Sequence, residues 1–391
     1  MRPMRDPAIR SSLIAVLATT LGVGLIFGFQ PPLIAMILAR DGVSSTMIGS
    51  VTSASALAVI ALGPAYPRII AWLGLRRAIL IGIGLAIIVL LALTLYSGIP
   101  IWIGLRLAGG SALGLSWIAS EIWLNSLATD RSRGTVMAAY ATVFAAGVVA
   151  GPLLLEFTGT VGLTPFVVGA GTLALTAVPL AFVRHVPEAS RDTTSTPGFV
   201  TLAAAAPSVM LAALIAGIVE SADLSLLPVF GLRSHLGERA ALLLVTVFLA
   251  GNVVLQIPIG QLADRFGRRA TLGACAIVGT VGPLLLPEVM QTPWLMWSLL
   301  FIWGGTMYGF YTQGLALLGE SYPASQLAAA NTVFVVVYCA GGVLGPSLGG
   351  LSMDLWRPAG LMVFVSAAAL LLIVGLLVES RRLQMRLRRR A

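Results

Sequence analysis

The chain has 391 residues, of which 58% are hydrophobic and only 10% are charged, whereas a soluble domain carries about 25% charged residues. A soluble fold of this length could not bury so much apolar surface, so the composition argues against a water-soluble enzyme and favours a membrane protein. All 24 Lys and Arg positions are arginines, and they lie in short clusters between apolar segments. A nucleic-acid-binding protein would gather them on one surface, so no nucleic-acid partner is expected.

Apolar windows predict twelve transmembrane helices, because crossing the hydrocarbon takes about 20 apolar residues and a helix pairs its own backbone groups. The first apolar stretch follows a basic N-terminus but is too long for a signal peptide, so we interpret it as a retained helix. In chain order, the predicted spans are 12–38, 46–67, 78–96, 100–127, 134–157, 161–183, 203–232, 240–263, 270–287, 294–319, 328–351 and 359–379.

Arginines in the loops predict which way these spans face, because cytoplasmic loops are enriched in positive charge. With both termini in the cytoplasm, 19 arginines fall on the cytoplasmic side, four on the other side and one, Arg106, inside a span. We therefore expect an integral protein of the bacterial inner membrane. Its Arg-rich C-terminus is expected to lie against anionic lipid headgroups.

One long polar stretch, RHVPEASRDTTSTPG, divides the spans into two sets of six. We predict an N-terminal six-helix bundle at 1–183, a cytoplasmic linker at 184–198, a C-terminal six-helix bundle at 199–380 and an Arg-rich tail at 381–391. The fold class is therefore an all-α membrane protein with two pseudo-symmetric bundles.

Glycine patterns repeat between the two predicted bundles at offsets of 194 to 197 residues. The matched groups are Gly109-Gly110-Ser111 with Gly304-Gly305-Thr306, Gly147-x-x-x-Gly151-Pro152 with Gly341-x-x-x-Gly345-Pro346, and Gly63 with Gly260. The order and spacing of these matches favour an internal repeat of one six-helix unit.

Several segments carry a family resemblance. GQLADRFGRRATL (260–272) is similar to the loop signature of the major facilitator superfamily, and LRLAGGSALG (105–114) and GVVAGP (147–152) resemble its fourth- and fifth-helix motifs. SEIWLN (120–125) resembles the YcaD-like bacterial branch. The resemblance implies secondary transport by alternating access between two bundles. One departure is Pro67, which stands where the first-half copy of the signature has an Asp.

The signature loop is predicted to form a gating latch. Gly260 would let two helices approach closely, and Asp264 would accept hydrogen bonds at a helix N-terminus. Arginines there could hold carboxylates, carbonyls or phosphates, although they could also serve only to set topology. In the fifth span, we expect Gly147, Gly151 and Pro152 to shape a close, bent packing face. The full set of latch residues is Gly260, Asp264, Arg265, Gly267, Arg268 and Arg269.

Ionisable residues inside the spans are the main candidates for function, because a charge in hydrocarbon is costly. Glu220 and Asp223 are three residues apart, so they share a helix face. Two carboxylates this close cannot both ionise cheaply, and one is expected to carry a transferable proton. Arg106 could anchor an anionic substrate or pair with Glu220 or Asp223. The remaining candidates are Gln30 and Gln313 for coupling or substrate, Trp117, Tyr308, Tyr311, Asn252 and Gln256 for a cavity, and Glu121, Arg133 and Glu320 for a cytoplasmic gate.

Energy for transport is expected to come from a gradient. The chain has no lysine, so it contains no Gly-x-x-x-x-Gly-Lys phosphate loop, and no metal-ligand spacing or cofactor is indicated. The resemblance of GVVAGP to the fifth-helix motif typical of the superfamily's proton antiporters implies a monomeric, proton-coupled transporter that exports a small molecule by antiport, and the two acidic residues of the seventh span suit such exchange. Two alternatives stay open: uptake of an anionic metabolite, with Arg106 as its anchor, and a receptor or assembly partner that does not transport.

Overall fold

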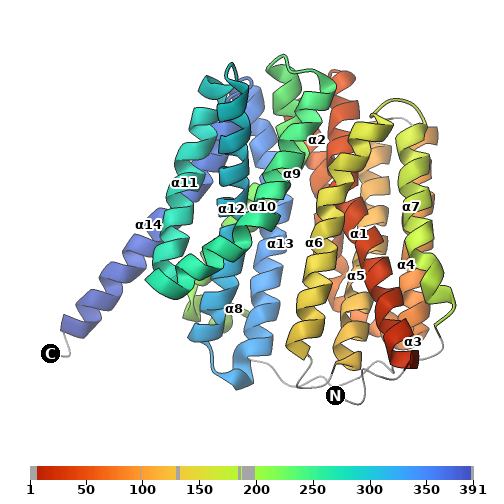
Figure 1. The fold of residues 1–391 in the computed structure, drawn as a ribbon, viewed down its shortest axis with the longest axis horizontal. Coiled ribbons are helices and arrows are strands. Elements are labelled where there is room, and N and C mark those ends of the chain that lie inside the picture. The colour runs from red at the N-terminus through yellow and green to blue at the C-terminus, as the bar shows by residue number, and fades with distance from the viewer. Residues whose placement is uncertain (1–6, 97, 129–132, 184–185, 187–198, 389–391) are drawn as a thin grey trace. The chain divides into compact units, whose positions relative to one another are not determined.

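The computed structural model describes residues 7–96, 98–128, 133–183, 186 and 199–388. Within these ranges every regular element is a helix (Figure 1). Contacts divide the chain into two compact units, one of residues 1–41 and 54–193 and the other of residues 42–53 and 194–391. Residue 186 apart, the predicted linker at 184–198 lies outside the described residues, as do residues 389–391 of the tail.

The first unit is built from seven α-helices and one short 3₁₀ turn, with the start of α2 assigned to the other unit. In this unit α1 packs along α6 and α7, and α4 packs along α5 and α7. The elements are α1 (Pro7–Arg40), α2 (Ser45–Leu62), η2 (Gly63–Ala65), α3 (Tyr66–Leu73), α4 (Leu75–Leu95), α5 (Ile99–Leu127), α6 (Arg133–Thr158) and α7 (Thr164–Ala181).

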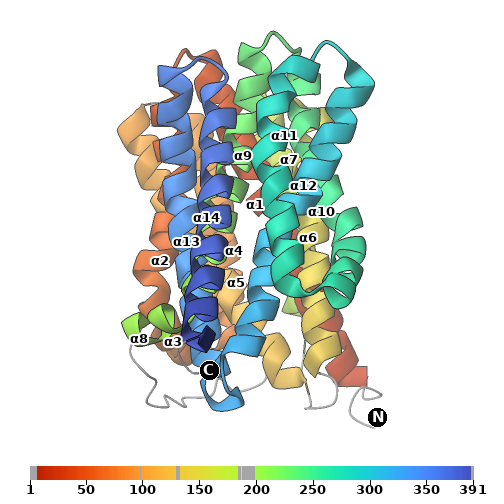
Figure 2. The ribbon, with the colours of Figure 1, turned by 90° about the vertical axis from the view of Figure 1, so that its left-hand side faces the viewer.

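The second unit has a similar arrangement, in which α9 packs along α13, α10 along α12, and α11 along both α12 and α14 (Figure 2). Its helices are α8 (Phe199–Ala205), α9 (Pro207–Arg233), α10 (Glu238–Phe266), α11 (Arg268–Val289), α12 (Pro293–Ser321), α13 (Ala324–Leu355) and α14 (Gly360–Arg388). The predicted span 203–232 is wrong at its start, because the helix breaks before Pro207. Proline has no amide hydrogen and is favoured in the first turn of a helix.

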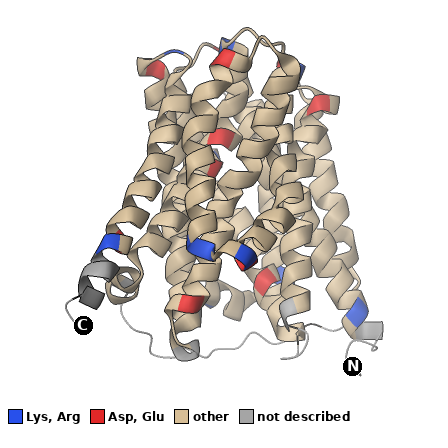
Figure 3. Cartoon of the chain, turned by 60° about the vertical axis from the view of Figure 1, so that its left-hand side comes forward, with Lys and Arg blue, Asp and Glu red and all other residues tan. Residues whose placement is uncertain are grey.

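The prediction of an all-α membrane fold is confirmed. The described residues contain twelve helices of 18 residues or more, and eleven of them are apolar enough to cross a membrane. The twelfth is α12, in which Trp, Tyr and Gly replace many aliphatic residues. Most charged residues gather near the helix ends and leave long uncharged stretches between them (Figure 3), as expected for helices surrounded by hydrocarbon.

Glycines bring α1 and α6 into backbone contact in the first unit. A Cβ atom on Gly28 would overlap the carbonyl of Val148, and one on Gly151 would lie 2.5 Å from backbone atoms of Gly28 and Phe29. Gly147 is similarly blocked by the carbonyl of Leu21. The predicted close packing of Gly147 and Gly151 is therefore present, and its partner is α1. Pro152 lies inside α6 directly after this contact.

The same crossing recurs in the second unit between α9 and α13. A Cβ atom on Gly217 would overlap the carbonyl of Tyr338, and one on Gly345 would overlap the carbonyl of Ile218. Gly341 faces the carbonyl of Leu214 in the same way. Small residues allow helices to approach this closely in lipid, where dispersion contacts replace the hydrophobic effect as the cause of association. The repeated sequence pattern therefore corresponds to a repeated helix crossing.

Adding one methyl group at this crossing should destabilise the protein. Gly151→Ala would force α1 and α6 apart, and overpacking of this kind costs about 1–3 kcal/mol. We expect a lower apparent Tm in detergent and poorer monodispersity. The matched control is Gly171→Ala on α7, where the added Cβ meets no atom within 4 Å and alanine is the better helix former. Equal Tm values for the two variants would contradict the proposed role of the crossing.

Candidate functional site

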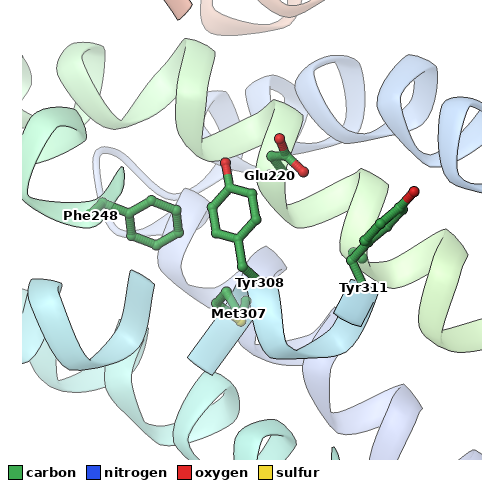
Figure 4. Close-up of a pocket in the computed structure, with 6 residues that line it drawn as sticks. Glu220, Phe248, Met307, Tyr308 and Tyr311 are labelled. Carbon is green, nitrogen blue, oxygen red and sulfur yellow. The ribbon is translucent and has the colours of Figure 1, made fainter. Parts of the chain in front are cut away.

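The two carboxylates of α9 lie one helical turn apart but in different surroundings. Asp223 is fully buried, with 0% of its surface exposed, and neither of its oxygens has a hydrogen-bond partner among the described residues. Glu220 is half-buried and accepts a hydrogen bond of 2.5 Å from the hydroxyl of Tyr338 on α13. Figure 4 also shows the hydroxyl of Tyr308 turned toward Glu220. Of the two carboxylates, only Glu220 is therefore held by polar neighbours.

Glu220 lies in a narrow pocket of the second unit between α9, α10 and α12 (Figure 4). The space around the lining side chains is about 210 Å³ with the open side included, and it leaves no room for a water molecule. In this conformation the pocket is therefore closed. The lining residues are Ala216, Glu220, Phe248, Met307, Tyr308 and Tyr311.

Aromatic rings surround this carboxylate. The ring of Tyr311 lies edge-on to Tyr338 and Phe334, with centroids 5.0 and 5.3 Å apart, and Phe248 and Tyr308 are 6.3 Å apart. The structure thus brings together three candidates from the sequence, Glu220, Tyr308 and Tyr311. The sequence analysis missed Tyr338 and Phe248. The signal for Tyr338 is its place one turn before the repeated Gly341 motif.

The other polar candidates of the second unit do not line this pocket. Gln256 donates a 3.2 Å hydrogen bond to the carbonyl of Gly305 and accepts one of 3.0 Å from Thr312, so it ties α10 to α12. Gln313 is buried, and its amide oxygen has no partner among the described residues. Asn252 is half-buried on α10.

In the first unit, Arg106 of α5 donates a 2.5 Å hydrogen bond to the side chain of Gln30 on α1. Both residues are 4% exposed, so the two candidates form a buried polar contact. Trp117 stacks on Phe144 at 5.9 Å and meets Phe27 edge-on at 5.8 Å. This aromatic cluster joins α1, α5 and α6. Pairing of Arg106 with Glu220 or Asp223 stays a prediction.

The signature loop ties helix ends together within the second unit. Gly267 connects α10 to α11 with a φ of +90°, which residues with a side chain rarely adopt. Arg268 donates to the carbonyl of Ala316 at 2.7 Å and pairs with Glu320 at 3.2 Å. Arg269 pairs with Glu379 of α14 at 2.8 Å. The arginines therefore bind carboxylates and a carbonyl.

Two expectations for this loop are wrong in this conformation. Gly260 has open space where a Cβ would lie, so within the second unit it permits no close helix approach. Asp264 is exposed, and no hydrogen bond from a helix N-terminus to it is present among the described residues. Arg265 lies over the ring of Phe266, 5.4 Å from its centroid.

The first-half copy of the loop has a different construction. Its positive-φ glycine is Gly74, and the residue three positions earlier, where the second copy has Asp264, is Ala71. The segment between Gly63 and Gly74 is longer than its counterpart because it contains η2 and α3, and Pro67 lies in α3. Arg76 donates to the carbonyls of Ala181 and Val183 at the end of α7, so a carbonyl contact replaces the Arg269 ion pair.

The cytoplasmic gate candidates are only partly described. Glu320 has a cationic partner, Arg268, as expected for a carboxylate near a helix C-terminus. Glu121 is half-buried on α5. Its expected partners, Arg131 and the side chain of Arg133, lie outside the described residues.

A polar cluster that the sequence analysis missed fixes the start of α2 within the second unit. Asp354, near the end of α13, accepts hydrogen bonds of 2.9 and 2.8 Å from the amides of Ser45 and Thr46. The Thr46 hydroxyl donates a third at 2.8 Å, and Arg233 pairs with Asp354 at 3.4 Å. A carboxylate at a helix N-terminus is favoured by the unpaired amides and the helix dipole. The Asp354–Ser45 contact joins residues 309 positions apart, so no local sequence pattern predicts it.

The family profile described as Major Facilitator Superfamily matches residues 13–243 and, in a second match, 209–390. The chain therefore belongs to the major facilitator superfamily, as its signature loop and glycine motifs suggested. Members are membrane transporters and not enzymes.

Relatives include two transporters that carry no assigned substrate in their names. The chain is 26% identical to the uncharacterised transporter YfkF of Bacillus subtilis over 362 residues, which cover 89% of this chain and 91% of YfkF. It is 28% identical to YcaD of Escherichia fergusonii over 295 residues, covering 74% and 75% of the two chains. The resemblance to the YcaD-like branch is therefore confirmed.

Solved structures support the same fold. A mutant form of the nucleoside transporter NupG superposes with a TM-score of 0.80 at 13% identity, over 94% of this chain and 99% of that one. A bacterial homologue of the lysosomal transporter Spinster gives a TM-score of 0.71 at 15% identity, over 97% and 98% of the two chains. At these identities the likeness concerns the fold alone.

Removing the Asp354 carboxylate should release the start of α2. Asp354→Ala removes the ion pair with Arg233 and leaves the amides of Ser45 and Thr46 without their acceptor, at a cost of about 1–3 kcal/mol. We expect faster hydrogen exchange in a peptide covering residues 42–53, measured by mass spectrometry. Asp264→Ala is the matched control, because it removes an exposed carboxylate that has no described partner. Unchanged exchange in Asp354→Ala would show that the helix start is held by other contacts.

Proposed function

We propose that this membrane transporter works by proton-coupled antiport and exports a small molecule by alternating access. Asp223 is the proposed proton carrier. Membership of the superfamily implies transport, and the fully buried Asp223 beside Glu220 on α9 supports proton coupling. The proposed arrangement is a monomer in the bacterial inner membrane with both termini in the cytoplasm, as the arginine distribution favours.

The observation that carries the proposal is the state of Asp223. An ionised carboxylate that is fully buried without a hydrogen-bond donor or cation costs several kcal/mol. Both oxygens of Asp223 are buried and have no hydrogen-bond donor among the described residues. We therefore propose that this group carries a proton in this conformation. Contact with water in another conformation would let it ionise and release that proton.

A proton carried in this way can drive transport. Moving one elementary charge through 100 mV supplies about 2.3 kcal/mol. In antiport, binding of the substrate must weaken binding of the proton, and the reverse. Two neighbouring carboxylates suit this requirement, because the charge state of one affects the other. Glu220 lies one turn from Asp223 and faces a pocket, so events at the pocket can act on the proton site over a short distance.

A second candidate function is uptake of an anionic metabolite. The observation that favours it is the buried guanidinium of Arg106, which contacts Gln30. This alternative predicts that Arg106→Gln abolishes binding of the transported anion, and that external acid stimulates uptake.

The proton carrier can be tested without knowing the substrate. Infrared spectroscopy of the full-length protein in proteoliposomes should show the carbonyl band of a protonated carboxylic acid near neutral pH. The band should be missing in Asp223→Asn. The control, Glu288→Gln, removes an exposed carboxylate on α11 and should leave the band in place. A band that persists in Asp223→Asn would exclude this residue as the carrier.

Coupling itself requires a flux measurement. In everted vesicles acidified inside, pools of small compounds should include one that dissipates the pH gradient when the native protein is present. Asp223→Asn should lose this response, and Glu288→Gln should keep it. If no pool dissipates the gradient, antiport is contradicted, and Arg106→Gln becomes the variant to examine for uptake.

A further inference from the structure

No described arginine of the second unit forms an ion pair with Glu220. The arginines that pair with carboxylates in the second unit, Arg233, Arg268 and Arg269, serve Asp354, Glu320 and Glu379. The hydroxyl of Tyr338 donates a hydrogen bond to Glu220. A phenol can donate a hydrogen bond to a carboxylate, but it cannot neutralise its charge. The pocket is therefore electrostatically incomplete when Glu220 is ionised.

We propose that this pocket binds the ammonium group of a cationic amine substrate, with Glu220 as the counter-ion. The inference rests on the proposed function and adds the substrate class to it. An ammonium group supplies the missing positive charge. A buried ion pair of this kind is favourable only when further contacts satisfy both partners, and the hydroxyls of Tyr338 and Tyr308 provide such contacts for the carboxylate.

The walls of the pocket fit this assignment. Phe248, Tyr308 and Tyr311 line it, and their rings present π-electrons to a cation. Cations within about 6 Å of an aromatic centroid gain roughly 0.5–2 kcal/mol, more where water is absent. Met307 adds a polarisable thioether to the same wall. A carboxylate ringed by aromatic side chains is thus suited to alkylated ammonium groups, which bind apolar surface and negative charge together.

The size of the pocket limits which part of the substrate enters. The pocket is narrow and leaves no room for a water molecule in this conformation, so its side chains must part before an alkylammonium head group enters, and an entire drug-sized molecule would need far more space. The remainder of the substrate would extend through the open side. We therefore expect selectivity to depend on the head group first and to tolerate variation in the attached chain.

The assignment gives the two α9 carboxylates separate tasks. Glu220, which is half-buried beside hydroxyl donors, holds the cation, and Asp223, which is fully buried without donors, holds the proton. Two titratable groups whose surroundings differ in this way commonly take different roles in one mechanism. A cation bound at Glu220 would favour loss of the proton from Asp223, and this proton can leave only when Asp223 is in contact with water. Cation binding and proton release are then coupled, as antiport requires.

Equilibrium dialysis with the full-length protein tests the assignment. The probes are choline and the uncharged alcohol in which a carbon atom replaces the nitrogen of choline. We expect choline to bind more tightly than the alcohol, and Glu220→Gln to weaken choline binding by about tenfold or more, which corresponds to about 1.4 kcal/mol. Tyr308→Leu should weaken it further than Tyr308→Phe, since phenylalanine keeps the ring. Glu288→Gln should bind as the native protein does.

Equal binding of choline and the alcohol, or choline binding that is unaffected by Glu220→Gln, would overturn the inference. Circular dichroism of each variant checks that lost binding is not lost folding. The infrared band of Asp223 is measured separately. If that band is present while choline fails to discriminate, the substrate class is wrong and proton coupling stands. If choline binds as expected and the band is absent, the proton carrier is wrong and the cation site stands.

Discussion

Every feature of this chain depends on the absence of water from the hydrocarbon core of a membrane. Backbone groups there must pair internally, so the described residues form helices, and charged residues lie mainly at helix ends. The same constraint acts on single side chains in the middle of a helix. Glu220 is held by a tyrosine hydroxyl, whereas Asp223 has no donor among the described residues, which supports its proposed role as proton carrier. One physical cost thus explains both the architecture and the chemistry of the candidate site.

The candidate site also shows why its helices must be considered together. Glu220 belongs to α9, Tyr308 to α12 and Tyr338 to α13. The α9–α13 contact is fixed by the glycine crossing at Gly217 and Gly341, which sets the distance over which Tyr338 reaches Glu220. A displacement of α12 relative to this pair would change the pocket wall while leaving the Tyr338 hydrogen bond intact. Substrate contacts and carboxylate contacts can therefore change separately.

Much of the fold could be predicted from the sequence, because long apolar segments and arginine clusters are local signals. The three-residue spacing of Glu220 and Asp223 was also visible, as was the candidacy of Tyr308 and Tyr311. The pairing of Glu220 with Tyr338 and of Asp354 with Ser45 was not. These helices are apolar on nearly all sides, so periodicity does not reveal which face meets which neighbour. The break at Pro207 and the open space at Gly260 likewise depend on packing that no single segment encodes.

The glycine crossings show where the two halves of the chain resemble each other most. Two of the three repeated motifs coincide with positions where a larger residue would press on a neighbouring backbone: Gly110 meets the carbonyl of Ser55 as Gly305 meets that of Gly251, and Gly147 meets Leu21 as Gly341 meets Leu214. The third pair, Gly63 and Gly260, has open space. Elsewhere the halves have diverged, as Pro67 and the extra turn before Gly74 show. The internal repeat is thus clearest where any side chain larger than hydrogen would overlap a neighbouring backbone.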